Sequence, residues 1–315
     1  MKTRSWHMEV LVLGGGPDSE RQVSLWSSQG VADALRGLGW QVRYEVIGRL
    51  TQRELSALPG GVIFPVLHGG WGEGGGLQDL LERDGRPYVG SRPHAARLAM
   101  DKMATKMAAA RAGVLTQEAA IFNPADEGSP VEFPVVVKPV HEGSSVGVHF
   151  VRAAGEWGGV REKVLGEQRE HPGRVYMIER AVLGGRELTV SVLDGRVLAP
   201  IEIIPKVAFY DYEAKYTSDD TKYVVSPELP RGVKETIQAG AAEMWAALGT
   251  RHLARVDFLL DRAGTAWMLE VNTMPGFTGH SLMPMAARDA GLSYADLCAA
   301  LVEMAVRDHA ARKAG

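Results

Sequence analysis

The sequence predicts an α/β protein of two or three domains, and three observations lead to that class. Apolar runs at residues 10–13, 42–46 and 61–67 alternate with a stretch of helical spacing at residues 23–38. Strand, helix and strand in this rhythm are typical of a parallel sheet, whose ligands bind at the carboxyl ends of the strands. Farther along the chain, strand-like runs are separated by glycine-containing turns. With 315 residues, 45% of them hydrophobic and 23% charged, the chain is long enough for more than one core.

Composition and charge argue against several classes of protein. The net charge of -3 and the isoelectric point near 6.3 give no field that would attract nucleic acid or an anionic membrane, so neither is expected as a partner. The apolar run after the basic N-terminus is too short for a signal peptide or a membrane span, and residues 1–7 are expected to form a disordered leader. The single cysteine, Cys298, cannot form an internal disulfide, which fits a reducing cytoplasm.

The middle of the chain changes from alternating helices and strands to hairpins. A segment of good helix formers at residues 101–112 ends at Gly113 and marks a domain boundary. Strand-like runs then follow at residues 135–137, 174–179 and 188–193. The pairs Gly184-Gly185 and Asp194-Gly195 are turns of the hairpin type.

The last third of the chain begins with a long irregular span. Residues 200–226 are polar and aromatic with little periodicity, and such spans are usually lids or disordered segments. An amphipathic helix is expected from just after Pro230 to about residue 248. Two strands and a loop follow, and a last helix begins at Ser293.

Polar side chains gather at one end of the two late strands. Asp257, Glu270 and Asn272 offer oxygen ligands beside the guanidinium of Arg255. Glu270 and Asn272 are two residues apart, so on an extended strand both point to the same face. Hard oxygen ligands suit magnesium. The alternative interpretation is an amphipathic hairpin whose acids face water.

A second candidate site follows the apolar run at residues 135–137. Lys138 ends that run, and a segment bounded by Gly143 and Gly147 carries two hydroxyl groups. Small residues let backbone N–H groups cradle phosphate oxygens while a lysine balances their charge. The alternative is an ordinary hairpin turn, since the segment matches neither of the common phosphate-loop motifs. Lys102 is a second phosphate-binding cation or a solvated helix lysine.

Several short motifs, none of them specific alone, occur in the order that one family shows. They are Gly14-Gly-Gly-x-x-x-Glu20-Arg-x-Val-Ser24, His68-Gly-x-x-Gly-Glu73, Tyr88-Val-Gly-Ser91, Met100-Asp-Lys102, Val137-Lys138-Pro with Glu142-Gly-Ser-Ser-Val-Gly147, Phe209-Tyr-Asp-Tyr-Glu-Ala-Lys-Tyr216, and Glu270-Val-Asn-Thr-Met-Pro-Gly276 with His280-Ser281-Leu. On these motifs the sequence resembles the D-alanine:D-alanine ligases of the ATP-grasp superfamily, from about residue 10 to about residue 301.

The resemblance implies a three-domain ATP-grasp architecture of mixed α/β and α+β class. A doubly wound parallel-sheet domain at residues 1–100 would precede two α+β subdomains that clasp ATP, at residues 101–182 and 183–315. The lid would lie at about residues 205–222. The implied activity is the ATP-dependent ligation of two D-alanines to D-alanyl-D-alanine in the cytoplasm, for peptidoglycan precursor synthesis. The family commonly forms homodimers, so a homodimer is expected.

The resemblance also implies an ATP site with two metal ions. Lys102 and Lys138 would neutralise phosphates, the hinge at residues 179–182 would receive adenine through backbone groups, and Glu187 would bind the ribose. The implied ATP-binding residues are Lys102, Lys138, Gly143, Ser144, Ser145, Val146, Glu179, Arg180, Val182, Glu187 and Lys215. Asp257, Glu270 and Asn272 would hold two Mg²⁺ ions, with Mn²⁺ as an alternative and a monovalent cation as a further candidate.

The implied reaction has two steps. The carboxylate of one D-alanine attacks the γ-phosphate to give an acylphosphate, and the amine of a second D-alanine then attacks its carbonyl. The oxyanion of the tetrahedral intermediate needs hydrogen-bond donors, for which Arg255 and the backbone N–H of Gly276 are the candidates. Glu20 would hold the first ammonium group. Its alternative role is that of an acid at a helix N-terminus.

The remaining implied roles concern the second substrate and the lid. Glu20, Ser144 and Tyr216 resemble a hydrogen-bonded trio that ties the N-terminal domain to the phosphate loop and the lid. Lys215 and Ser281 resemble ligands of the second substrate's carboxylate. The lid would close before chemistry because water hydrolyses an acylphosphate. His68 faces the first substrate by resemblance, although a lone histidine can equally be structural.

Substrate choice and two departures from the family pattern complete the prediction. Tyr216 accompanies ligation to an amine in the family, which predicts a dipeptide product. The alternatives are a related ligase that makes D-alanyl-D-lactate or D-alanyl-D-serine, and a nucleotide-binding module without catalysis. The family usually has aspartate where this chain has Gly74, and the run Gly74-Gly-Gly76 adds backbone freedom. Phe277 stands where methionine is common.

Overall fold

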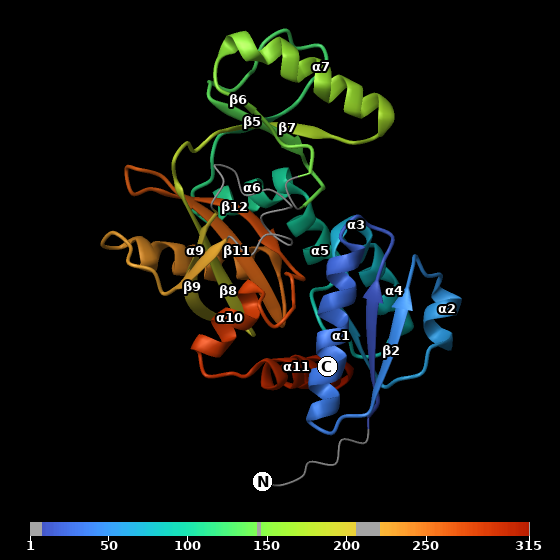
Figure 1. Ribbon diagram of the computed structural model, residues 1–315. Coiled ribbons are helices and arrows are strands. Elements are labelled where there is room, and N and C mark those ends of the chain that lie inside the picture. Colours follow the sequence, from blue (N-terminus) through green and yellow to red (C-terminus); the bar gives the residue numbers. More distant parts are fainter. Residues whose placement is uncertain (1–7, 144–145, 206–220, 315) are drawn as a thin grey trace.

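The computed structural model describes residues 8–143, 146–205 and 221–314 (Figure 1). In these ranges the chain forms three sheets that follow one another in sequence and meet around a central cleft. The second sheet, with its helix α7 (Ala154–Glu170), lies at the top of Figure 1, above the other two sheets. The predicted leader at residues 1–7 lies outside the described residues.

The first sheet is parallel and has the strand order β2-β1-β3. Its strands are β1 (Val10–Gly15), β2 (Val42–Ile47) and β3 (Val62–Pro65), and the helices around it are α1 (Arg21–Gly37), α2 (Gln52–Ala57), α3 (Gly69–Gly72) and α4 (Gly76–Asp84). Because β1 lies between its two successors, the chain reverses its direction of winding there. Such a switch point opens a crevice at the carboxyl ends of the strands. Glu20 and His68 follow β1 and β3 at this edge.

The second sheet is antiparallel and has the order β4-β7-β5-β6. Its strands are β4 (Ala119–Ile121), β5 (Val135–Pro139), β6 (His149–Val151) and β7 (Tyr176–Arg180). Helix α7 covers one face, where Trp157 and Val164 join an apolar cluster with the strands. Lys138 and Glu179 lie near the centre of this sheet, on neighbouring strands.

The third sheet is antiparallel and has the order β10-β9-β8-β11-β12. Its strands are β8 (Arg186–Leu193), β9 (Arg196–Ile204), β10 (Lys222–Val225), β11 (Leu253–Leu260) and β12 (Ala266–Asn272). The helices α5 (Pro93–Met100), α6 (Lys102–Arg111) and α9 (Val233–Leu248) share an apolar core with this sheet.

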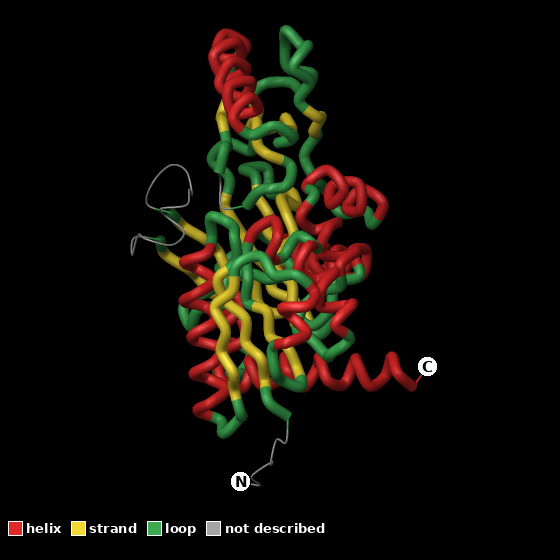
Figure 2. Tube along the Cα trace, turned by 90° about the vertical axis from the view of Figure 1, so that its right-hand side faces the viewer, coloured by secondary structure: helices red, strands yellow, loops and turns green. Residues whose placement is uncertain are grey.

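The last two helices join the third sheet to the first. Helix α10 (Leu282–Asp289) packs on β8 and β9, and helix α11 (Tyr294–Ala314) packs on α1 and β3. Figure 2 shows α11 running along the lower part of the molecule to the C-terminus. Residues of α1, β1, β3, β9, α10 and α11 form one apolar cluster. The C-terminal segment therefore completes the core of the N-terminal part of the chain. The predicted division into consecutive domains assigns this segment to residues 183–315 and does not include that contact.

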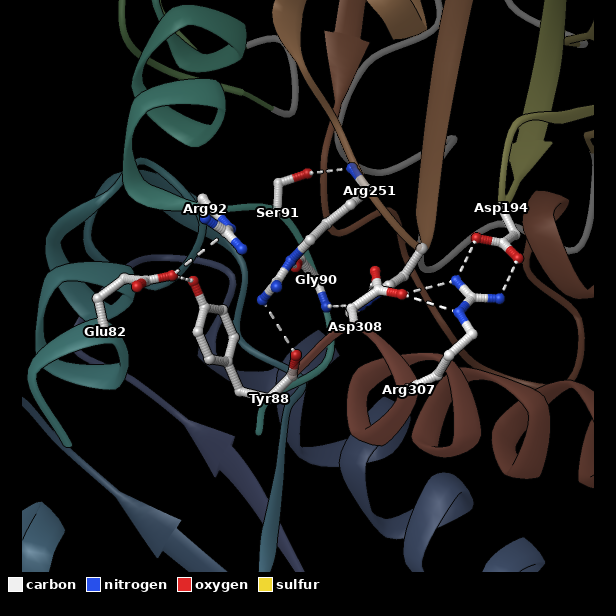
Figure 3. Close-up of polar contacts among 10 residues, drawn as sticks. Glu82, Tyr88, Gly90, Ser91, Arg92, Asp194, Arg251, Arg307 and Asp308 are labelled. Carbon is white, nitrogen blue, oxygen red and sulfur yellow. Dashed lines mark hydrogen bonds and ion pairs between the residues drawn. The ribbon is translucent and has the colours of Figure 1, made fainter. Parts of the chain in front are cut away.

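A polar junction also joins these two parts of the chain (Figure 3). The Arg251 guanidinium lies over the Tyr88 ring, with its central carbon 4.4 Å from the ring centroid, and donates to the Gly90 carbonyl at 2.7 Å. The Gly90 N–H donates to Nδ1 of His252 at 3.0 Å. The other ring nitrogen of His252 lies 3.1 Å from Asp308. We refer to Tyr88, Gly90, Arg251, His252 and Asp308 as the interdomain junction.

Most predicted elements are confirmed, but one predicted hairpin is wrong and one predicted irregular span is partly wrong. The Asp194-Gly195 hairpin is confirmed, since both residues have positive φ, 50° and 79°, and connect the paired strands β8 and β9. The Gly184-Gly185 hairpin is wrong, because the turn connects β7 and β8, which belong to different sheets. The predicted irregular span at 200–226 is also partly wrong, since its ends continue β9 and form β10. Among the described helices none is long and apolar enough to cross a membrane.

Candidate active site

Two adjoining cavities meet at the centre of the molecule. The first is lined by residues that follow β1 and β3 and by the ends of β11 and β12. The second lies between the second and third sheets and is lined by residues of β5, β7, β8, β9 and β12. Six residues line both cavities: Lys102, Glu142, Gly143, Glu187, Ile203 and Glu270. The two cavities therefore form one continuous cleft, with charged side chains at the boundary between them.

Glu20 lies at the N-terminus of α1 but also lines the first cavity. The residue is 8% exposed, and its side chain makes no capping hydrogen bond to α1. Gly276 and Ser281 line the same cavity from the far end of the sequence. The structure thus brings together three residues that the resemblance assigned to substrate binding and oxyanion stabilisation.

His68 presents one free acceptor nitrogen to the first cavity. Its Nδ1 lies 3.0 Å from the Met274 carbonyl oxygen, so Nδ1 carries the proton and donates it. Burial lowers the pKa of His68, against the opposing effect of Glu20, so the ring is neutral. Its Nε2 is buried and has no hydrogen-bond partner among the described residues. A neutral imidazole with this tautomer accepts a hydrogen bond at Nε2, which suits a substrate N–H group.

The registers of β11 and β12 place four predicted residues on one face. Asp257 pairs with Glu270, and Arg255 pairs with Asn272. The pairing shifts between Asp257 and Phe258 because β12 has one extra residue there. Consequently Leu269 and Glu270, which are adjacent in sequence, both line the second cavity. The predicted common orientation of Glu270 and Asn272 is confirmed, since both line the first cavity.

Asp257 is held by two neighbouring side chains. The Arg255 guanidinium donates to both of its oxygens, at 2.9 and 2.8 Å, and the Thr189 hydroxyl donates to one at 2.6 Å. Arg255 itself lines the first cavity, whereas Asp257 is only 4% exposed. The bidentate pair therefore fixes the guanidinium that the resemblance assigned to the oxyanion.

Glu73 connects the loop after β3 to the end of β12. Its Oε1 accepts from the Gly69 N–H at 3.0 Å. With the Asn272 amide oriented to satisfy both of its ends, its nitrogen donates to Glu73 at 3.2 Å and its oxygen accepts from Arg255 at 3.1 Å. Burial and the nearby Glu20 carboxylate raise the pKa of Glu73 to about 8. Sequence reasoning quoted Glu73 only as part of a motif and gave it no role.

The donor set at the ends of β11 and β12 fits a hard divalent cation. Asp257 and Glu270 supply carboxylate oxygens and Asn272 an amide oxygen. Oδ1 of Asp257 accepts from both Arg255 and Thr189, so only its Oδ2, which accepts one hydrogen bond, retains a lone pair for an ion, and Asp257 lines neither cavity. Glu270 lines both cavities, and its Oε2 lies 3.9 Å from Nζ of Lys102. The described part of the chain has no group of three or more His, Cys, Asp or Glu side chains that could hold a metal ion, so this donor set depends on the amide oxygen of Asn272 as well.

The second cavity gathers the residues predicted for ATP. Lys102, Lys138, Gly143, Val146, Glu179, Arg180, Val182 and Glu187 all line it. Lys102 is 9% exposed, so the solvated alternative is wrong. The backbone N–H groups of Arg180 and Ala181 donate to the carbonyls of Glu118 and Pro134, both at 2.9 Å. Those two donors are used within the sheet, so adenine recognition would fall to the other backbone groups of the hinge.

Lys106 does not line the cavity but contacts Glu179, which does, and sequence reasoning missed it. It lies on α6, and its Nζ is 2.5 Å from Oε1 of Glu179. Lys138 lies 2.5 Å from the other oxygen of the same carboxylate. The missed signal was spacing, because Lys106 is four residues after Lys102 and so lies on the same side of the helix.

The loop that carries Gly276 is held from three directions. The Phe277 N–H donates to the Ser27 hydroxyl at 3.2 Å, and the Tyr294 hydroxyl donates to the Phe277 carbonyl at 2.7 Å. The buried Phe277 ring packs against Phe64 and Tyr294. Ser281 accepts from the Thr278 N–H at 3.0 Å.

Four predicted site residues, Ser144, Ser145, Lys215 and Tyr216, lie outside the described residues.

The fold and the cleft together define a class of enzyme. Two antiparallel sheets that face each other across a cation-lined cleft, with a parallel-sheet domain at one end, form the ATP-grasp fold of nucleotide-dependent ligases. The sequence model of the family described as D-ala D-ala ligase C-terminus matches residues 106–303.

Individual relatives agree with this class over nearly the whole chain. The D-alanine--D-alanine ligase of Bordetella parapertussis is 41% identical over 305 residues, which cover 94% of this chain and 95% of the relative. A crystal structure of D-alanine--D-alanine ligase from Bacillus anthracis has a TM-score of 0.84 at 31% identity, covering 98% of this chain and 100% of that one. The same ligase complexed with ATP has a TM-score of 0.81 at 28% identity, with the same coverage. The chain belongs to the D-alanine--D-alanine ligase family.

Proposed function

We propose that this protein joins two D-alanines to D-alanyl-D-alanine with ATP, for the synthesis of peptidoglycan precursors. The observation that carries the proposal is the continuity of the cleft. The cavity lined by Lys138 and Glu179 opens into the cavity lined by Glu20 and Arg255, with Lys102 and Glu270 shared between them. Such a cleft can hold a triphosphate in contact with an amino acid carboxylate.

In the first step, the D-alanine carboxylate attacks the γ-phosphate of ATP, the bond to the β,γ-bridging oxygen breaks, and ADP leaves as the acylphosphate forms. Lys102 and Lys138 balance the phosphate charge, and Glu20 binds the ammonium group of this first substrate. The free Nε2 of His68 accepts a further hydrogen bond from the same region of the substrate. Holding both reactants in one geometry removes much of the entropic barrier to the reaction.

In the second step, the amine of the second D-alanine attacks the acylphosphate carbonyl, and phosphate then leaves. The Arg255 guanidinium and the Gly276 N–H donate to the developing oxyanion. Ser281 and Lys215 bind the carboxylate of the second substrate, and Tyr216 acts with Glu20 and Ser144 to order the cleft. These roles rest on the family motifs.

Asp257, Glu270 and Asn272 are the residues that would hold two Mg²⁺ ions, and Mn²⁺ suits the same oxygen ligands. Bound there, the ions supply charge neutralisation to the phosphates. A monovalent cation, a homodimer and a cytoplasmic location belong to the same proposal, on the basis of the family resemblance.

The test measures phosphate release from ATP with D-alanine, L-alanine, D-serine and D-lactate in parallel. D-Alanine is expected to give the highest kcat/KM, and the product should be the dipeptide. Turnover with D-lactate or D-serine that equals or exceeds turnover with D-alanine near neutral pH would instead favour the related ligases. ATP binding without any D-alanine-dependent phosphate release would favour a non-catalytic nucleotide-binding protein.

The matched variant is Glu270→Gln, which keeps the size of the side chain and removes its charge. We expect phosphate release to fall more than about 100-fold, because metal-borne charge stabilisation contributes several kcal/mol. Activity within a few-fold of the unsubstituted enzyme would contradict the metal site.

A further inference from the structure

Three buried charged side chains form a cluster at the back of the second cavity. Glu179 lies between Lys106 and Lys138, with one ammonium group at 2.5 Å from each carboxylate oxygen. The side chains of Lys106, Glu179 and Lys138 are only 7%, 7% and 9% exposed. We call these residues the lysine–glutamate cluster.

The composition of this cluster is unusual for a purely structural arrangement. One buried carboxylate needs one cation for neutrality, and burying a second cation costs free energy unless a further anion compensates it. Two lysines and one glutamate leave one positive charge in excess. Lys138 and Glu179 line the cavity that also contains Lys102, so the excess charge is available to an anion that enters there.

The two lysines of the cluster are anchored differently. Lys106 also donates to the Thr116 hydroxyl at 2.5 Å, and Thr116 donates to the Met268 carbonyl of β12 at 3.1 Å. Lys106 is thereby tied to α6, to the third sheet and to Glu179 at once. Lys138 is on a strand of the second sheet and lines the cavity, where its ammonium group can reach a bound ligand.

We propose that Lys106 is a positioning residue for nucleotide binding. Lys106 neutralises Glu179, so that the positive charge of Lys138 is available to the phosphates. The proposal rests on the proposed use of ATP and adds a residue that does not itself touch the ligand. Without Lys106, Glu179 would pair with Lys138 alone, and the cluster would carry no excess charge. Burial lowers the pKa of Lys106, partly offset by Glu179, which agrees with a cation placed at a free-energy cost.

The test compares Lys106→Met with Arg111→Met, which removes an exposed cation from the end of the same helix. Binding of ADP and of adenosine, each with Mg²⁺ and without D-alanine, is measured by titration calorimetry. Lys106→Met is expected to weaken ADP binding about 10-fold and adenosine binding less than about 2-fold, because only ADP carries phosphates. Arg111→Met should leave both affinities unchanged. In turnover, the KM for ATP should rise while the KM for D-alanine stays constant.

Two further variants keep the proposal testable if Lys106→Met folds poorly. Lys106→Arg retains the cation and should restore ADP binding to within about 3-fold of the unsubstituted protein. In a Glu179→Gln background, where Lys138 has no carboxylate partner, Lys106→Met should cost less ADP affinity than it does alone, as expected for coupled residues.

Three outcomes would overturn the inference. They are equal losses of ADP and adenosine affinity, a loss of thermal stability with unchanged ADP affinity, and strictly additive effects of the Lys106 and Glu179 substitutions. Failure of the proposed function looks different: ADP would bind normally and respond to Lys106→Met, while D-alanine would not stimulate phosphate release.

Discussion

At the scale of single residues, a hydroxyl on the last helix helps to position a candidate catalytic backbone group. Tyr294 and Gly276 are far from the N-terminal domain in sequence, yet the loop after Gly276 is bonded to Ser27 on α1. Tyr294 bonds the carbonyl of the intervening Phe277. Because the Gly276 N–H must point at the oxyanion, a small rotation of this peptide matters for rate more than for binding.

We therefore predict that Tyr294→Phe lowers kcat roughly 10-fold with little change in the KM for ATP. Stability should fall by about 1 kcal/mol, the usual net contribution of one hydrogen bond. Steady-state kinetics and urea unfolding measure both effects. Tyr44→Phe is the matched control, since it removes a hydroxyl that bonds Ser28 away from the loop. Stability loss without any change in kcat would show that Tyr294 only supports the fold.

At the scale of elements, the loop between β3 and α4 needs its glycines for packing. The sequence suggested that the run at residues 74–76 adds backbone freedom. In the structure, a Cβ atom on Gly74 would lie 2.3 Å from the Gly70 carbonyl oxygen. Gly75 has a φ of +106°, which a side chain rarely tolerates. The backbone around Gly74 is therefore closely packed and leaves no room for the aspartate that is usual at this position. The loop that carries His68 and Glu73 is held in one conformation by this packing.

For this loop, we predict that Gly74→Ala destabilises the protein by about 1–3 kcal/mol and raises the KM for the first D-alanine, because the added methyl group displaces the loop. Gly70→Ala is the control, since its Cβ would have no atom within 4 Å. Thermal unfolding and D-alanine kinetics of both variants test the prediction. Equal behaviour of the two variants would mean that the loop adapts without cost.

At the scale of the whole molecule, the interdomain junction holds the N-terminal domain against the third sheet. Because the Gly90 N–H donates to Nδ1 of His252, the ring proton is on Nε2 and is donated to Asp308. Two residues of the junction, Arg251 and His252, immediately precede β11, which carries Arg255 and Asp257. The junction therefore sets where the guanidinium of Arg255 lies relative to residues such as Glu20 on the other domain.

The junction makes stability depend on pH. Burial, together with the nearby Arg251, lowers the pKa of His252 from 6.5 to about 4, although Asp308 opposes this. The unfolded chain binds a proton near pH 6.5 and the folded chain only near pH 4. The contribution to stability is thus complete above pH 6.5 and is lost as pH falls through 4.

Between pH 7.5 and pH 5, we expect this histidine to account for about 2 kcal/mol of lost stability. His252→Asn cannot titrate and tolerates the positive φ of 64° at this position. Urea unfolding of both proteins at the two pH values should show a smaller loss for the variant. Parallel losses would mean that other groups cause the acid sensitivity.

Residues of the candidate site that follow a local pattern could be placed from the sequence, although their roles stay predictions. Glu270 and Asn272 share a face because of strand periodicity, and Lys102 and Lys138 were identified by motif and by their position at element ends. Lys106 and the role of Glu73 were not predicted. Their partners, Glu179 and Asn272, are distant in sequence, and no local pattern reports such a contact.

The amino-acid sequence by itself determined most of the elements and the family, and it predicted the types of ligand for the cleft, because periodicity, turn chemistry and motif order are local properties. The tertiary structure alone decided which charges share a partner, which nitrogen of His68 is free, and that α11 completes the N-terminal core. Those features depend on burial and on contacts between distant segments, which exist only once the chain has folded.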